Sequence, residues 1–336
     1  MIAGNRWLVG LLVGLFAFAA WGQTSEKVFY FTHLDTPQAL QEVTNMVRVV
    51  GDIRDVSPDA AKQSLTVRGT ADQIAAAGWL TAEMDKPAGA TGPRDYPFSD
   101  ARAPLARVVY LSHVDNPRDL QEIVNAVRSV LDVQRCYPMS RQRAIVMRGM
   151  PEQVKAAGWL LGVLDRPAGP QPGGAPPPDY RLPEEDWSYT RGRELVVRVA
   201  ALTHADTPQA VQETVNTVRA IADIQRCFPL SERRLLVMRG NDDSMALVAW
   251  LLKQLDGPAG QGTSEFKMGG AGGQIAQVAF VNAATPQSLQ ETVNQIRTET
   301  KTVRVFPFLP QKAVAMRGTA DELAQAQQVI QARQGK

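Results

Sequence analysis

One pattern of residues recurs four times along this chain of 336 residues, and every copy keeps the same internal spacing. The pattern is Thr/Asn-Pro-x-x-Leu/Val-Gln-Glu-x-x-Asn-x-Val/Ile-Arg, and an Arg-Gly pair follows it at a fixed distance. Constant spacing without insertions is typical of a compact unit that was copied whole. The sequence therefore predicts four small domains in tandem, whose patterns begin at Thr36, Asn116, Thr207 and Thr285.

The elements of one copy predict an α+β fold of the order strand, helix, strand, strand, helix. In the third copy we expect these elements at 195–202, 208–222, 223–228, 235–238 and 242–255. Thr207 and Asn241 are expected to cap the two helices, because both side chains readily accept a hydrogen bond from the first helical turn. A strand that returns to its sheet through a helix makes a right-handed crossover. The sequence therefore predicts a three-stranded sheet with both helices on one face.

The domain boundaries follow from the repeat and from the composition between copies. We predict domains at 26–87, 106–167, 195–258 and 275–331, joined by linkers at 88–105, 168–194 and 259–274. The middle linker is rich in proline and should be extended, whereas the last is rich in glycine and should be flexible. Domains of about sixty residues are close to the lower size limit for folding alone, so docking against neighbours should stabilise them.

The fourth copy departs from the other three. It lacks the Asp-x-Pro sequence that ends the second helix elsewhere, and Gln328 replaces a tryptophan found at one position of that helix. A degenerate terminal unit is common in repeat arrays. The tryptophans, predicted to pack in the core with an exposed binding role as the alternative, are Trp79, Trp159 and Trp250.

The start of the chain predicts export. Arg6 precedes an apolar stretch at 8–20, and small residues lead to Gln23, which is typical of a signal peptide at 1–22. An uncleaved anchor is the alternative, although the apolar stretch is short for a membrane span. We expect a periplasmic protein without a transmembrane segment after removal of the signal.

The formal net charge is +2 and the isoelectric point is near 8.5, so the surface is almost balanced. A block of basic residues that could hold nucleic acid through its phosphates is missing from the sequence, so no nucleic-acid partner is expected.

Two cysteines occupy equivalent positions in the second and third copies. The first and fourth copies have Val56 and Val305 there, which favours a buried strand position where cysteine acts as a small hydrophobe. An oxidising compartment would also allow a disulfide between Cys136 and Cys227, provided that their Cα atoms lie within about 7 Å. Both alternatives stay open at this stage.

The order of elements and its motifs resemble the periplasmic N-domains of bacterial secretins. The motifs are a second hairpin strand that ends in Gly-Thr, as in 65–70, and a helix that ends in Leu-x-x-x-x-Asp-x-Pro, as in 80–87. The resemblance covers all four copies and implies ring-building, KH-like modules that self-associate or dock onto a secretion or pilus apparatus, without catalysis. We do not expect the strand-rich pore region of a secretin after Gln331. The KH relationship does not imply RNA binding, because a Gly-x-x-Gly clamp between helices is missing.

The three histidines each stand two residues before an aspartate, at Asp35, Asp115 and Asp206. A His-x-Asp pair could serve acid–base or metal chemistry, but one histidine with one carboxylate is a poor metal site. The fourth copy has Asn282 and Ala284 instead. We therefore expect the histidine to end the first strand, the aspartate to help cap the helix, and the protein to have no catalytic residues, cofactor or metal. These histidines are His33, His113 and His204.

Polar residues of the first helix recur at spacings of four and three, and the Arg of each Arg-Gly pair is expected near them. Recent duplication would also explain their identity. We predict that they form contacts with a neighbouring domain or with another protein. These residues are Gln41, Asn45, Arg48, Arg68, Gln121, Asn125, Arg128, Arg148, Gln212, Asn216, Arg219, Arg239, Gln290, Asn294, Arg297 and Arg317.

The sequence leaves two candidate functions. The first is a non-enzymatic scaffold or adaptor whose modules assemble with each other or with a secretion or pilus complex of the envelope. The second is a protein that binds an envelope polymer such as peptidoglycan through linker aromatics and the Arg-Gly turns. These aromatics, which could also pin the linkers to a domain, are Tyr96, Phe98, Tyr180, Trp187, Tyr189 and Phe266.

Overall fold

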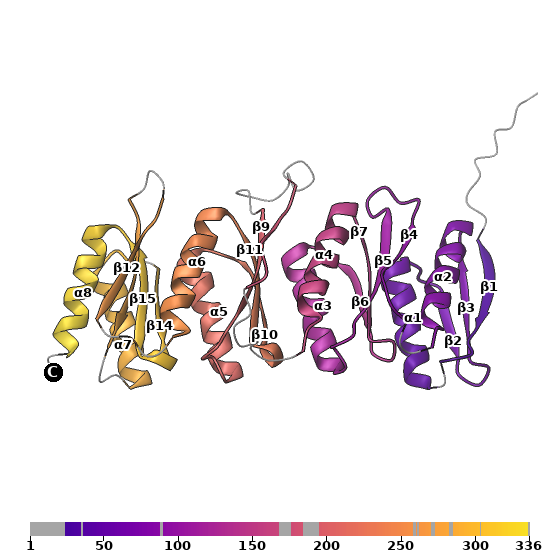
Figure 1. Cartoon of the computed structure of the whole chain (residues 1–336), viewed down its shortest axis with the longest axis horizontal. Coiled ribbons are helices and arrows are strands. Elements are labelled where there is room, and N and C mark those ends of the chain that lie inside the picture. The colour runs from indigo at the N-terminus through magenta and orange to yellow at the C-terminus, as the bar shows by residue number, and fades with distance from the viewer. Residues whose placement is uncertain are drawn as a thin grey trace, which may run out of the picture.

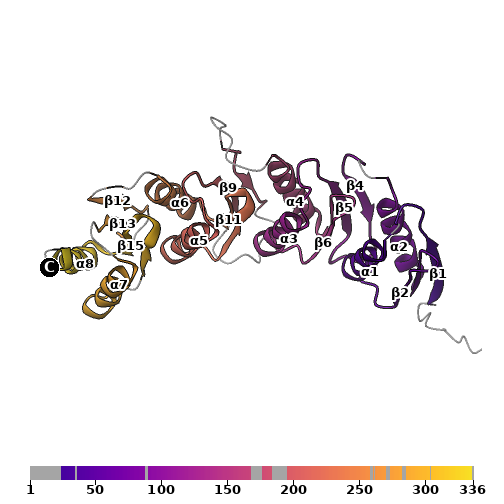
Figure 2. The same cartoon turned by 90° about the horizontal axis from the view of Figure 1, so that it is seen from below.

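Four βαββα units follow one another along the long axis of the molecule (Figures 1 and 2). The computed structural model describes residues 24–334 except residues 35, 88–89, 168–175, 184–194, 258–259, 261, 270–272, 282–284 and 303. The expected signal peptide, the linker residues Trp187 and Tyr189, and Asp35, Asn282 and Ala284 lie outside the described residues. In the part that is described, every helix falls short of the length and apolar character that crossing a membrane requires.

Each unit has the predicted order of elements, and the predicted α+β class is confirmed. Unit 1 contains β1 (Ser25–Tyr30), α1 (Pro37–Gly51), β2 (Val56–Asp59), β3 (Ser64–Gly69) and α2 (Ala71–Met84). Unit 2 contains β4 (Arg94–Pro97), β5 (Leu105–Tyr110), α3 (Pro117–Leu131), β6 (Arg135–Met139), β7 (Ala144–Gly149) and α4 (Pro151–Leu164).

The last two units repeat this arrangement. Unit 3 contains β8 (Tyr180–Arg181), β9 (Val196–Ala201), α5 (Pro208–Ala222), β10 (Arg226–Leu230), β11 (Leu235–Gly240) and α6 (Asp242–Leu255). Unit 4 contains β12 (Thr263–Lys267), β13 (Ile275–Phe280), α7 (Pro286–Glu299), β14 (Arg304–Phe308), β15 (Ala313–Gly318) and α8 (Ala320–Gln334).

The sheets differ from the three-stranded prediction in one respect. Unit 1 has three antiparallel strands in the order β1-β3-β2, but units 2, 3 and 4 each have four. The extra strands β4, β8 and β12 lie in the predicted linkers and pair antiparallel with the first strand of the following unit. The linkers were predicted as connections from their composition, whereas each extra strand is short and is held by pairing along the edge of the strand that follows it.

The residues at which the first helices begin and end recur at equivalent positions of the units. Thr36, Asn116, Thr207 and Thr285 cap them as predicted, each accepting a backbone hydrogen bond from the first turn. In the first three units the helix ends at an aspartate in the left-handed conformation, with φ of 57°, 58° and 60°. A left-handed residue after the last turn is a common way to stop a helix. These aspartates are Asp52, Asp132 and Asp223.

The units stack because the sheet of each later unit covers the helices of the unit before it (Figure 1). Val108, Val146 and Met139 of unit 2 belong to the hydrophobic core of unit 1. Val199, Val237 and Leu230 of unit 3 belong to that of unit 2. The corresponding residues of unit 4 in the core of unit 3 are Val278, Ala315 and Phe308. Burial of these apolar side chains between the sheet of one unit and the helices of the preceding unit stabilises the contact, so the stack is one continuous structure.

The outward face of the first sheet is different, because no described unit lies beyond it. Thr66 and Asp59 of unit 1 stand where unit 2 has Val146 and Met139. Tyr30, on the outer strand β1, is 70% exposed. A polar outer face on a terminal unit is typical of repeat arrays, in which it prevents aggregation.

Two tyrosines at equivalent positions test the contribution of stacking to stability. Tyr110 packs against the core of unit 1 and its hydroxyl donates to the carboxylate of Glu83 at 3.0 Å, whereas Tyr30 is exposed. We expect Tyr110→Ala to lower the free energy of unfolding by about 2 to 4 kcal/mol, and Tyr30→Ala to change it by less than about 0.5 kcal/mol. Chemical denaturation of both variants measures the difference. Equal effects would contradict the role of the unit 1–unit 2 junction.

Candidate functional site

The three junctions between units share one ion pair that joins a helix end to a strand start. The left-handed aspartate after the first helix accepts from an arginine at the start of the hairpin in the next unit. Asp52 lies 2.8 Å from Arg135, Asp223 lies 2.7 Å from Arg304, and Asp132 pairs with Arg226. Each bond thus connects residues 81 to 94 positions apart in sequence.

The arginines of the later Arg-Gly pairs also reach the preceding unit. Arg148 is 4% exposed, and its Nη1 donates to the carbonyl oxygens of Val50 and Gly51 at the end of α1, at 3.3 and 3.4 Å. Burial lowers the pKa of the Arg148 guanidinium from its usual value, and nearby Arg135 acts in the same direction. Asp100, whose carboxylate lies 3.2 Å from Nη2, partly offsets this effect.

The arginines at the equivalent positions also reach the end of the preceding first helix, through different acceptors. Arg239 is fully buried and its Nη2 lies 3.1 Å from the carboxylate of Asp132. Arg317 donates from Nη1 to the carbonyl oxygen of Ile221 at 3.2 Å. Arg68 of unit 1 has no described unit before it, and it pairs with Glu26 on its own sheet, where 62% of its side chain is exposed.

The hairpin turns supply two further contacts that the sequence prediction missed. A glutamate on the first helix accepts from a backbone N–H in the next turn: Glu42 from Ser140 at 3.0 Å, Glu122 from Ser231 at 2.9 Å, and Glu213 from Leu309 at 3.2 Å. A long polar side chain of the same turn donates to a carbonyl at the end of the preceding second helix. The donors and acceptors are Gln142 with Met84, Arg233 with Leu164, and Gln311 with Leu255.

The arginines that end the first helices serve their own units. Arg48 donates from Nη2 to the carbonyl oxygen of Val56 at 2.6 Å, and Arg297 makes the same bond to Val305 at 2.6 Å. Arg219 bonds the carbonyl oxygen of Cys227 at 2.5 Å, and Arg128 bonds that of Cys136. These four residues therefore tie the first helix to the hairpin within one unit.

The predicted glutamines and asparagines form one hydrogen bond within each first helix. The amide of Gln41 donates to Asn45, that of Gln121 to Asn125, that of Gln212 to Asn216, and that of Gln290 to Asn294, at 3.0 to 3.2 Å. All four glutamines are exposed. The helices that carry them, α1, α3, α5 and α7, lie along one side of the stack (Figures 1 and 2).

The tryptophans of the second helices pack against aromatic residues of the linkers. Trp79 stacks on Tyr96 with ring centroids 5.1 Å apart, Trp159 lies 5.1 Å from Tyr180, and Trp250 lies 5.7 Å from Phe266. Each aromatic belongs to the extra edge strand of the next unit. The linkers are thus pinned onto the preceding unit, as one alternative of the sequence analysis predicted.

The histidine loops are structural in the described units. The carboxylate of Asp165, after α4, accepts from the backbone N–H groups of Ser112 and His113 at 2.7 to 2.9 Å. Asp85 and Asp256 hold the loops of His33 and His204 in the same way. Groups of three or more His, Cys, Asp or Glu side chains able to hold a metal ion are missing from the described residues.

Both cysteines are free and buried in the structure, which agrees with the alternative in which cysteine acts as a small hydrophobe. Cys136 lies in the core of unit 2 and Cys227 in that of unit 3, each with 1% exposure or less. Equivalent strands of stacked units belong to separate cores, so their thiols do not meet. Burial raises the pKa of each thiol to about 12.

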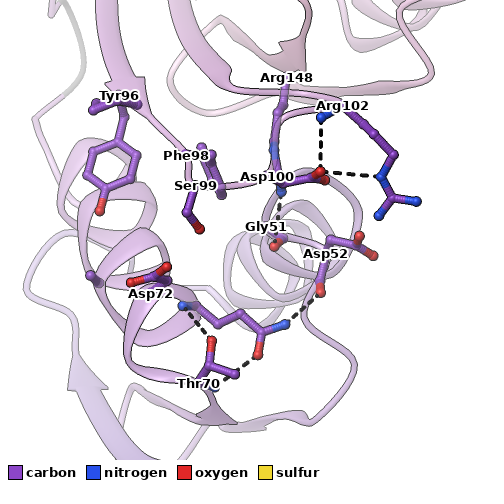
Figure 3. A pocket seen from close by; sticks show the side chains of 13 residues that line it. Gly51, Asp52, Thr70, Asp72, Tyr96, Phe98, Ser99, Asp100, Arg102 and Arg148 are labelled. Atoms are coloured by element: carbon purple, nitrogen blue, oxygen red, sulfur yellow. Dashed lines mark hydrogen bonds and ion pairs between the residues drawn. The ribbon is translucent and has the colours of Figure 1, made fainter. Parts of the chain in front are cut away.

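A hollow of about 700 Å³ lies at the junction of units 1 and 2, between the end of α1, the start of α2 and the loop after β4 (Figure 3). Several of its charged groups are paired: Asp100 with Arg102 and Arg148, and Asp52 with Arg135, while Asp72 also lines the hollow. A smaller hollow of about 300 Å³ occupies the same position between units 3 and 4 and is lined by Asp223 and Arg317.

Comparison with solved structures finds secretin N-terminal domains. The chain is similar to the N-terminal domain of the secretin XcpQ from Pseudomonas aeruginosa, with 12% identity over 43% of this chain and 63% of that chain, and a TM-score of 0.19. It is similar to Aeromonas hydrophila ExeD, with 14% identity over 73% of this chain and 43% of that chain, and a TM-score of 0.17.

A third similar structure is the ETEC pilotin–secretin complex AspS–GspD, with 13% identity over 91% of this chain and 54% of that chain, and a TM-score of 0.17. The chain thus spans less than two thirds of the length of each of these proteins. Neither a protein-family model nor a curated protein sequence matches the chain. Comparison of structures thus also finds the likeness to secretin N-domains that the sequence indicates. At these sequence identities the likeness concerns the fold alone.

Arg148 and Arg68 give a matched test of the junction, because they share one position of the repeat. Arg148→Ala removes a buried donor from the carbonyls at the end of α1, and we expect it to lower the free energy of unfolding by about 2 to 4 kcal/mol. Arg68→Ala removes an exposed pair, which solvent screens, so it should change the free energy of unfolding much less than Arg148→Ala does. Denaturation with hydrogen exchange at α1 measures both. The role assigned to Arg148 is wrong if α1 keeps its protection in that variant.

The buried cysteines should resist thiol reagents in the folded protein. With a pKa of about 12, roughly one thiol in ten thousand is ionised at pH 8, and burial also blocks access. We expect no reaction with a colorimetric disulfide reagent in native buffer and two thiols per chain after denaturation. Rapid labelling of the native protein would contradict the burial of both side chains.

Proposed function

We propose that this protein is a non-enzymatic, periplasmic scaffold whose stacked units mediate assembly with a secretion or pilus complex of the envelope. The resemblance of the sequence to secretin N-domains and the expected signal peptide support this assignment. The fold supports it as well, since stacked units offer an extended and regular surface, which repeat proteins use for binding.

One observation carries the proposal: the exposed glutamines of the four first helices are identical and take no part in any junction between units. The junctions use Asp52, Arg135, Arg148, Glu42 and their equivalents. Each glutamine bonds only the asparagine one turn later among the hydrogen bonds of the described residues. We define these residues, Gln41, Gln121, Gln212 and Gln290, as the glutamine row and propose that it contacts a partner protein.

The sequence analysis also placed four helix arginines in this surface. Arg48, Arg128, Arg219 and Arg297 hold the hairpins of their own units, so we assign them a positioning role beneath the glutamine row. The arginines of the later Arg-Gly pairs, in contrast, contribute to the stiffness of the array.

Binding of an envelope polymer is the weaker alternative. The linker aromatics Tyr96, Tyr180 and Phe266 each pack against the ring of a tryptophan, so less of their ring surface is available to a saccharide. Retention of the chain on insoluble cell wall would favour the alternative.

The glutamine row can be tested without disturbing the fold. We expect Gln121→Arg combined with Gln212→Arg to reduce recovery of the envelope complex with a tagged chain about tenfold, because bulk and charge at the centre of an interface are costly. The measurement is quantitative pull-down from solubilised envelopes, followed by light scattering of the complex. The control is Gln325→Arg on α8, which is also exposed. Equal recovery by the double variant and the control would argue against the glutamine row as the interface.

A further inference from the structure

Strand β1 has an open edge that is filled at the same place in the other three units. The first strands β5, β9 and β13 each lie between two neighbours, and their outer neighbours are β4, β8 and β12. In the sheet of unit 1, β1 pairs only with β3 among the described residues. An open edge presents unpaired backbone N–H and C=O groups to an incoming strand.

The three strands that fill this position carry the same chemistry. An acidic residue on β4, on β12 and directly before β8 binds a polar side chain of the first strand: Asp95 lies 2.7 Å from Arg107, Asp179 lies 2.7 Å from Arg198, and Glu265 accepts from Gln277 at 2.6 Å. The hydrogen bond to Arg107 lowers the pKa of the Asp95 carboxyl. Each unit that has a fourth strand therefore places a carboxylate at this position.

Lys27 stands at the equivalent position of unit 1. It lies opposite Val67 on β3, as Arg107 lies opposite Met147 on β7. Lys27 is exposed, and its ammonium lies 5.2 Å from the ring of Phe29. The edge therefore carries a cation where an incoming strand would place its carboxylate.

The residue after the acid is aromatic in all three internal strands, as Tyr96, Tyr180 and Phe266. In unit 2 this aromatic lies opposite Ala106 on the outward face of the sheet. The same place in unit 1 lies opposite Glu26 and diagonal to Val28, which is 38% exposed. An apolar side chain there would cover Val28.

We propose that the β1 edge binds an extended, acidic strand of a partner protein in antiparallel pairing. The partner carboxylate binds Lys27 on the helix side of the sheet, and the next residue, aromatic or apolar, covers Val28 on the outward side. This inference rests on the proposed function, because it names a place where a partner of the scaffold docks. Addition of a strand to an open sheet edge is a general mode of peptide recognition.

A second copy of β1 fits this edge less well. Residues that lie opposite one another in an antiparallel pair point to the same face of the sheet. Those of β1 that share a face with Lys27 are Ser25, Phe29 and Lys27 itself, so a second β1 would offer no carboxylate. Among the described residues, the edge lies at one end of the stack, and no other strand pairs with it (Figure 1).

The test uses the chain from Gln23 to Lys336, which contains every described residue, and a peptide of residues 262–268. This peptide contains β12, which fills the same position in unit 4. We expect its addition to shift the amide NMR signals of β1 and to leave those of β13 unchanged. Lys27→Glu should weaken binding about tenfold, since it turns an attraction into a repulsion.

A charge exchange makes the test specific. The same peptide with Glu265→Lys should bind the wild-type chain weakly and restore binding to the Lys27→Glu chain. Lys62→Glu, an exposed lysine on the turn of the same unit, is the control and should bind the original peptide like the wild type. Both β1 and the peptide are short, so we expect weak binding that calls for peptide in excess.

Three outcomes would overturn the proposal: no shift in β1, an equal affinity of the Lys27→Glu chain for both peptides, or self-association of the wild-type chain through β1 that excludes the peptide. These outcomes concern the β1 edge alone. The pull-down with the glutamine-row variants reports on the proposed function separately, so failure of one experiment can be distinguished from failure of the other.

Discussion

Burial of one sheet face against the helices of the preceding unit is the interaction on which this structure depends. A unit of about sixty residues has too little interior to be very stable alone. Val108, Val146 and Met139 extend the core of unit 1 with side chains from unit 2. The same addition occurs at each later junction, so neighbouring units are expected to stabilise one another, as in other repeat proteins.

Polar contacts surround this apolar surface and fix the position of each unit on the preceding one. The Asp52–Arg135 ion pair and the Glu42 bond to the next hairpin recur with equivalent residues at each junction, and an arginine at the position of Arg148 reaches the end of the preceding first helix at each one. Hydrogen bonds of this kind require defined distances and directions, whereas apolar contact alone does not. The combination makes each unit follow the last with a constant orientation, and the first helices consequently line one side of the stack.

The two ends of the array differ from its middle in a way that follows from stacking. Asp55 stands at the position of Arg135, Arg226 and Arg304, and Lys301 stands at that of Asp52, Asp132 and Asp223. The aspartate of this ion pair therefore repeats in units 1 to 3 and its arginine in units 2 to 4, whereas the positions of Glu42 and Arg148 keep the same residue in all four units, as Glu291 and Arg68 show at the two ends. This offset pattern is the signal from which the junctions could have been found. A comparison of the four copies for identical residues alone does not reveal it.

The sequence by itself determined the repeated unit, since Thr207, Asn241 and the apolar spacing of each helix act locally through caps and periodicity. It also placed the tryptophans and the polar stripe of the first helix. Only the tertiary structure decided which polar residues hold units together: Arg148 does, Arg48 does not, and Gln41 stays exposed. The fourth strand of units 2 to 4 is a further example, because β4 is held by pairing along the edge of β5 and by the stacking of Tyr96 on Trp79 of the preceding unit. Contacts of this kind depend on which surfaces meet after folding, and the local pattern of one copy does not contain that information.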